Sequence, residues 1–115
     1  MGQIDTNYNK CIEKNKYSGC CVKDYSEQVD KMLNLVYKNL LIKASNEKEK
    51  KSIKLDQRKW LNNRKVAYAK ILKDLEKESE AKFNDFGTME KDLLLIGETS
   101  YQYDRVAFLI KKLNK

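Results

Sequence analysis

The sequence predicts an all-helical fold, an antiparallel bundle of three long helical segments. Apolar residues recur at steps of three and four through three long stretches, which is the period of an amphipathic helix. The chain contains no proline to interrupt them, and no stretch keeps the two-residue alternation of a strand. A length of 115 residues with 41% hydrophobic content suffices for one folded domain, residues 1–115.

The first part of the chain, residues 1–20, is expected to be an irregular arm, because it lacks a clear period and is rich in turn-forming asparagine. Cys11 and Cys20 lie in this arm and Cys21 follows directly. A bond from Cys11 to either of the other two would close a short loop, whereas a Cys20–Cys21 bond needs a strained ring. We expect a structural disulfide, with free or intermolecular thiols as the alternative. Zinc is disfavoured, because the spacing is wrong and the chain has no histidine.

Helices are predicted over residues 22–42, 47–82 and 88–113. Asn46 followed by Glu49 has the pattern of a capping box and sets the second start, and Thr88 is the candidate N-cap of the third helix. A break at Gly97 would raise the count to four. The first helix has the clearest apolar stripe: Val22, Tyr25, Val29, Leu33, Val36, Tyr37 and Leu40. The expected inner positions of the third helix are Met89, Leu93, Ile96, Tyr103, Val106, Ala107, Ile110 and Leu113.

The second helix carries polar residues on its apolar face, since Gln57, Trp60, Leu61 and Arg64 share one stripe. Polar groups that face a core must find partners. We expect Asp30 to approach Arg64 across the first two helices, with Asn34 and Gln57 nearby, as a structural seam. Trp60 could stack a sugar or a base, but aromatic residues at helical spacing are usually core residues, and we interpret it so.

No catalytic constellation emerges from the sequence. Glycosidase-type chemistry needs two carboxylates, and the predicted seam offers one. The chain has no histidine, which is the usual general base, and it contains neither a phosphate-binding loop nor a nucleophile elbow. We therefore predict a non-enzyme that uses no cofactor and no metal.

The net charge of +7 and the pI of about 9.2 favour contact with anionic material. The lysines alternate with glutamates, so we interpret them mainly as solvated helix faces. Nucleic-acid binding is a weaker option, because arginines are few and no recognised motif is present. No stretch approaches the ~20 apolar residues of a membrane span.

Two central motifs resemble the LprI-type lysozyme-inhibitor domain family. They are Cys21-x3-Tyr25-x4-Asp30-x2-Leu33-Asn34-x2-Tyr37-x2-Leu40 and Gln57-x2-Trp60-Leu61-x2-Arg64. The resemblance implies a secreted or envelope-associated helical domain that binds a protein, with a lysozyme as the inferred target. Lys65 stands where the family usually has aspartate, and no cysteine follows Cys21. Disulfides from the arm to later helices, which members can form, are therefore impossible here.

The function predicted from these observations is a non-catalytic binding protein that resembles LprI-type inhibitors and is secreted, periplasmic or envelope-bound. Clustered cysteines suit an oxidising compartment, and we expect a signal peptide to have been removed ahead of residue 1. The alternative is a structural module that binds an anionic envelope polymer or another protein. Animal lysozymes are typically basic, so a chain of charge +7 would need a local acidic patch. Binding residues are expected in the arm, in residues 43–51 or in residues 84–88.

Overall fold

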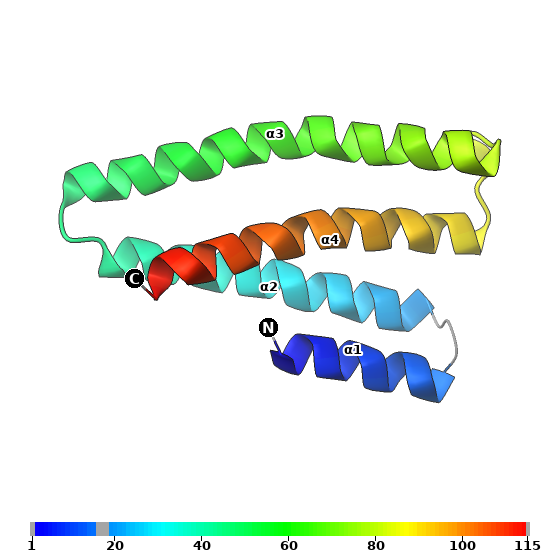
Figure 1. Ribbon diagram of the computed structural model, residues 1–115, viewed down its shortest axis with the longest axis horizontal. Coiled ribbons are helices and arrows are strands. Elements are labelled where there is room, and N and C mark those ends of the chain that lie inside the picture. The colour runs from blue at the N-terminus through cyan, green and yellow to red at the C-terminus, as the bar shows by residue number, and fades with distance from the viewer. Residues whose placement is uncertain (1, 16–18, 115) are drawn as a thin grey trace.

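The computed structural model describes residues 2–15 and 19–114, with side chains for 2–11 and 21–114. Four α-helices follow one another: α1 (Gly2–Asn15), α2 (Gly19–Lys43), α3 (Glu47–Ser79) and α4 (Thr88–Leu113), with a short 3-10 turn, η1 (Phe83–Asp85), before α4 (Figure 1). No strand occurs within the described ranges. The predicted all-helical class is thus confirmed.

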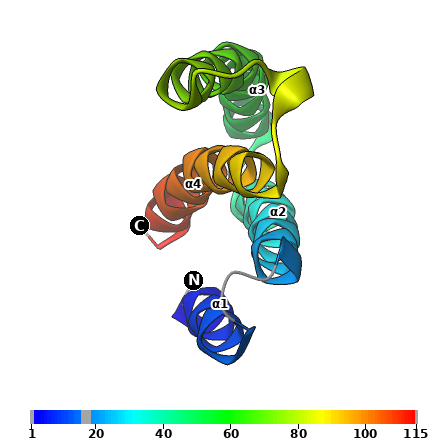
Figure 2. The same ribbon diagram turned by 90° about the vertical axis from the view of Figure 1, so that its right-hand side faces the viewer.

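The fourth helix is the centre of the architecture. Each helix runs antiparallel to the one before it, and α4 lies between α2 and α3 (Figures 1 and 2). α4 packs along α2 and also contacts α3, whereas α2 and α3 barely touch. α1 packs on α2 at the opposite edge from α3. The result is a flat molecule, with extents of 49 × 32 × 16 Å.

The hydrophobic core lies between α1, α2 and α4. Its buried members are Ile4, Val29, Leu33, Val36, Leu40, Val106 and Leu109. The stripe predicted for α2 therefore points inward as expected. α3 contributes little to this core, since its only buried residue among the described ones is the polar Gln57. α3 must therefore be held in place chiefly by other contacts.

The expectation of an irregular arm is wrong for residues 2–15, which form α1. Ile4, Tyr8 and Cys11 follow the i, i+4, i+7 spacing of one helix face, and that face meets α2. Ile4 joins the core, the Tyr8 and Tyr25 rings lie 4.4 Å apart, and the Tyr103 hydroxyl on α4 donates a 2.8 Å hydrogen bond to Asp5. Tertiary contacts thus hold a helix that its own composition favours weakly.

The helix boundaries follow from local chemistry. α3 begins at Glu47 as predicted, because the Asn46 side chain accepts the Glu49 N–H at 2.8 Å. α3 ends at Ser79 rather than at residue 82, because Glu80 adopts a left-handed conformation with φ 57°. The N-cap of α4 is Gly87 rather than Thr88, and the Glu90 carboxylate accepts the Gly87 N–H at 3.1 Å.

Gly97, the position at which a break would have added a helix, neither breaks nor splits α4, and the helix is continuous past it. A Cβ atom at this position would lie 2.9 Å from the Ile71 side chain of α3. The glycine therefore permits the close approach of α4 to α3. The helix that raises the number from the predicted three to four is α1, at the N-terminus.

Candidate functional site

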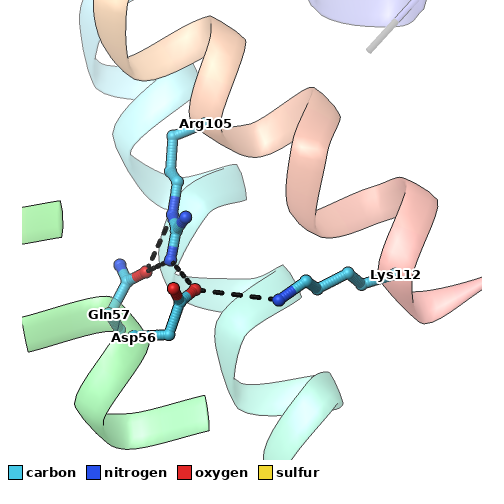
Figure 3. Close-up of polar contacts among 4 residues, drawn as sticks. All are labelled: Asp56, Gln57, Arg105 and Lys112. Carbon is cyan, nitrogen blue, oxygen red and sulfur yellow. Dashed lines mark hydrogen bonds and ion pairs between the residues drawn. The ribbon is translucent and has the colours of Figure 1, made fainter. Parts of the chain in front are cut away.

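The contact between α3 and α4 is built around a buried arginine, Arg105 (Figure 3). Its guanidinium donates two hydrogen bonds to Gln57 Oε1, at 3.1 and 2.8 Å, and one to Asp56 Oδ2 at 2.8 Å. Lys112 Nζ lies 3.8 Å from the same aspartate oxygen. The hydrogen bond from Arg105 lowers the pKa of Asp56 below its ordinary value. Asp56 and Gln57, which are adjacent on α3, are thereby hydrogen-bonded to α4.

Aromatic rings and cations alternate along this contact. Arg64 lies over the Trp60 and Tyr68 rings at 5.5 and 5.8 Å. Arg105 lies over Trp60 and Phe108 at 5.5 and 5.0 Å, and Lys112 lies 4.8 Å from the Phe108 ring centre. We call this set the cation–aromatic row: Tyr68, Arg64, Trp60, Arg105, Phe108 and Lys112. Its Trp60 also stacks on Tyr101 at 5.7 Å, so the tryptophan is engaged on several sides.

The predicted pairing of Asp30 with Arg64 is wrong. Arg64 donates instead to Gln102 Oε1 of α4 at 3.0 Å, and Gln57 pairs with Arg105. The reason is that α4 lies between α2 and α3. Residues of α4 therefore form the bonds with Gln57 and Arg64 that the sequence pattern had assigned to residues of α2. Asn34 is exposed on α2 and takes no part in the α3–α4 contact.

Asp30 and Arg64 nevertheless line one surface cleft of about 460 Å³ where α2, α3 and α4 meet. Its lining residues are Ser26, Glu27, Asp30, Arg64, Lys65, Tyr68, Leu95, Glu98, Thr99 and Gln102. The three carboxylates of the cleft, Glu27, Asp30 and Glu98, form no ion pair among the described residues. Burial raises the pKa of Glu98, and it raises that of Tyr68 to about 12. The cleft can therefore offer unpaired carboxylates to a cation.

Sequence reasoning missed Glu27 and Glu98 as site residues. Glu27 lies three positions before Asp30 on α2, a helical spacing that a sequence reading could have used. Glu98 is brought beside them only by the packing of α4, and no pattern in the sequence signals that.

The disulfide prediction is confirmed, and the structure selects one of the alternatives. Cys11 of α1 is bonded to Cys21 of α2, with Cα atoms 5.6 Å apart. The side chain of Cys20 lies outside the described residues. No group of three potential metal-ligating side chains occurs in the described part of the chain.

A comparison with known protein families identifies the family of this chain. The family model described as "Lysozyme inhibitor LprI" matches residues 9–109. The chain belongs to the LprI lysozyme inhibitor family. The resemblance carried by the two motifs is thereby confirmed. No curated protein and no solved structure matches the chain.

The residues of the LprI motifs have different environments in the fold. Leu33 is buried, and Tyr25, Tyr37 and Trp60 pack against the core. Gln57 and Arg64 bond to α4, as described above. Asp30, Asn34 and Leu61 are exposed. Most of the motif thus has a packing contact, and Asp30 is the motif carboxylate that faces a cleft.

A second concavity of this LprI protein is an apolar groove of about 640 Å³, where α4 begins beside α1 and α2. Met89, Leu93 and Ile96, predicted as inner positions, are 72%, 49% and 36% exposed, and all three line it. That prediction is wrong because the described helices leave this end of α4 uncovered on one side. The other lining residues are Tyr8, Asn9, Val22, Thr88 and Asp92.

No helix in the described part of the chain is long and apolar enough to cross a membrane.

Proposed function

We propose that this protein is a secreted or envelope-exposed inhibitor that binds a lysozyme-type muramidase and blocks its surface without catalysing a reaction. Membership of the LprI lysozyme inhibitor family supports the target class. The observation that carries the proposal is the cleft lined by Glu27, Asp30 and Glu98, because a basic enzyme needs carboxylates on its binder.

The distribution of charge reduces the repulsion that a chain of charge +7 would exert on a basic lysozyme. Residues 50–73 of α3 contain nine cations and one carboxylate, a net charge of +8. The rest of the chain contains 15 cations and 16 carboxylates, a net charge of −1. Repulsion of a basic partner is therefore concentrated on α3, which contributes Arg64 and Lys65 to the cleft, whereas the rest of the chain is close to neutral.

The cleft suits an arginine or a lysine of the partner. A carboxylate and a guanidinium form paired, charge-assisted hydrogen bonds that are about twice as strong as neutral ones. Arg64 leaves the carboxylates available because it lies between Trp60 and Tyr68 and donates to Gln102. An incoming cation would also lower the raised pKa of Glu98 and so favour its ionised form.

A muramidase lysis assay tests the proposal. The purified protein at micromolar concentration should slow lysis of bacterial cell walls by animal or bacterial lysozymes. The triple variant Glu27→Gln/Asp30→Asn/Glu98→Gln should raise the inhibitory concentration by at least about tenfold. The matched control Asp74→Asn/Glu78→Gln/Asp85→Asn removes three carboxylates outside the cleft and should inhibit normally.

Two outcomes would contradict the proposal. Undiminished lysis across animal and bacterial lysozymes would exclude inhibition of this enzyme class. Equal loss of inhibition in the cleft variant and the control would show that net charge, and not the cleft, governs binding.

The apolar groove favours a second candidate, an interaction module of the envelope that holds another protein. Exposed Met89 and Leu93 beside Tyr8 offer an apolar surface suited to a protein partner. Salt distinguishes the two modes, because binding through the carboxylates weakens as salt screens charge and apolar docking does not.

A further inference from the structure

The outward face of α3 is the most strongly charged surface of the molecule. α3 lies at one edge, with α4 beside it on one side only (Figure 2). The exposed residues between positions 51 and 73 include seven cations and no carboxylate. The cations are Lys51, Lys54, Arg58, Lys59, Lys65, Lys70 and Lys73. Asp56, the one carboxylate of this segment, is bound to Arg105. The positive charge of this face is therefore not neutralised within α3.

This face also carries two exposed apolar side chains. Leu55 and Val66 are 64% and 72% exposed. These two positions are eleven residues apart, about three turns, so both lie on the same side of the helix, which they share with the polar Asn62 and with Lys73. Lys51, Lys54, Arg58 and Lys65 flank Leu55 and Val66 on one side, and Lys59 and Lys70 flank them on the other.

We infer that the outward face of α3 binds the surface of an anionic lipid bilayer. A helix at such an interface keeps its lysines at the phosphate level while apolar side chains enter the acyl boundary between them. The segment 51–73 extends about 33 Å at 1.5 Å per residue, with cations along its length and exposed apolar side chains at Leu55 and Val66. A soluble polyanion would satisfy the cations but leave Leu55 and Val66 in water, so the bilayer accounts for more of the face.

Vesicle co-sedimentation of the whole protein tests this inference. Vesicles of phosphatidylcholine with phosphatidylglycerol should bind the protein, and pure phosphatidylcholine vesicles should not. Each cation near an anionic surface contributes about fivefold to partitioning, so Lys51→Gln/Lys54→Gln/Arg58→Gln should weaken binding by about 100-fold. The matched control Lys23→Gln/Lys31→Gln/Lys38→Gln removes three exposed cations of α2 and should bind within about threefold of the unmodified protein.

A second variant separates a bilayer from a soluble polyanion. Leu55→Ser/Val66→Ser keeps every charge and should weaken vesicle binding by at least about fivefold. Unchanged vesicle binding by this variant, together with equally tight binding of the protein to soluble polyphosphate, would overturn the inference in favour of a soluble polyanion. Equal loss in the α2 control would also overturn it, as would binding to neutral vesicles. Circular dichroism should show that each variant remains helical.

Failure of the vesicle-binding test can be distinguished from failure of the lysozyme-inhibition test. None of the substituted α3 residues lines the cleft between α2, α3 and α4, so lysozyme inhibition should not be weakened in these variants.

Discussion

Replacing Arg105 by alanine should destabilise the fold by about 2–5 kcal/mol. Gln57 Oε1 would lose both of its donors in a buried position, which costs about 1–3 kcal/mol. The contacts of the guanidinium with Trp60 and Phe108 add about 0.5–1 kcal/mol each. Asp56 adds little, because its side chain is 44% exposed and water can replace the arginine.

Urea unfolding followed by circular dichroism measures this loss, and Trp60 fluorescence reports on the same contact. Arg105→Lys should fall between the alanine variant and the unmodified protein, because an ammonium keeps the charge but lacks the planar fork. Arg58→Ala is the control, since Arg58 is exposed on α3 and should change stability by less than about 0.5 kcal/mol. A double-mutant cycle with Gln57→Ala should give a coupling of about 1 kcal/mol or more.

An Arg105→Ala protein within about 0.5 kcal/mol of the unmodified one would refute this reasoning. It would mean that water satisfies Gln57 and that α3 is held by other contacts. A coupling near zero between Arg105 and Gln57 would locate the effect in the aromatic contacts alone.

Three further predictions concern other contacts. Cys11→Ser should cost about 2–3 kcal/mol by releasing a ten-residue loop, and thiol counting on the unmodified, non-reduced protein should give one free group per chain; three would exclude the disulfide. Burial raises the pKa of Tyr25 and Tyr68 from 10.0 to about 12, so these tyrosines ionise at lower pH in the unfolded chain than in the folded protein. Stability is then fully present below pH 10 and should fall as pH rises from 10 to 12, less steeply in Tyr68→Phe; identical slopes would contradict this. Gly97→Ala should destabilise by about 1 kcal/mol through contact with Ile71, but should stabilise in an Ile71→Ala background, where helix propensity alone remains; destabilisation in both would exclude this contact as the cause.

The sequence determined the helices that bury apolar side chains at regular spacing. α2 is the clearest case, because Val29, Leu33, Val36 and Leu40 follow one stripe and all lie in the core. The start of α3 was equally readable, because the cap of Asn46 is a contact within a few residues. The two motifs of the LprI family could also be read directly, since they are local.

α1 shows where local reading stops. Its asparagines favour turns, and tertiary contacts such as the packing of Ile4 on the core, the disulfide and the Tyr103–Asp5 hydrogen bond hold the segment as a helix on α2. Gly97 makes the same point from the other direction. Its propensity suggests a break, but the closeness of α3 explains the glycine.

The sequence alone determined the fold class, the presence of a disulfide and the fact that Gln57 and Arg64 need polar partners. Which partners they take was decided only by the tertiary structure. α4 lies between α2 and α3, so Arg105 and Gln102 bond the residues that Asp30 and Asn34 were expected to reach. The cleft that joins Glu27, Asp30 and Glu98 has the same origin. A periodic pattern shows which face of a helix turns inward, but it does not show which helix will lie there.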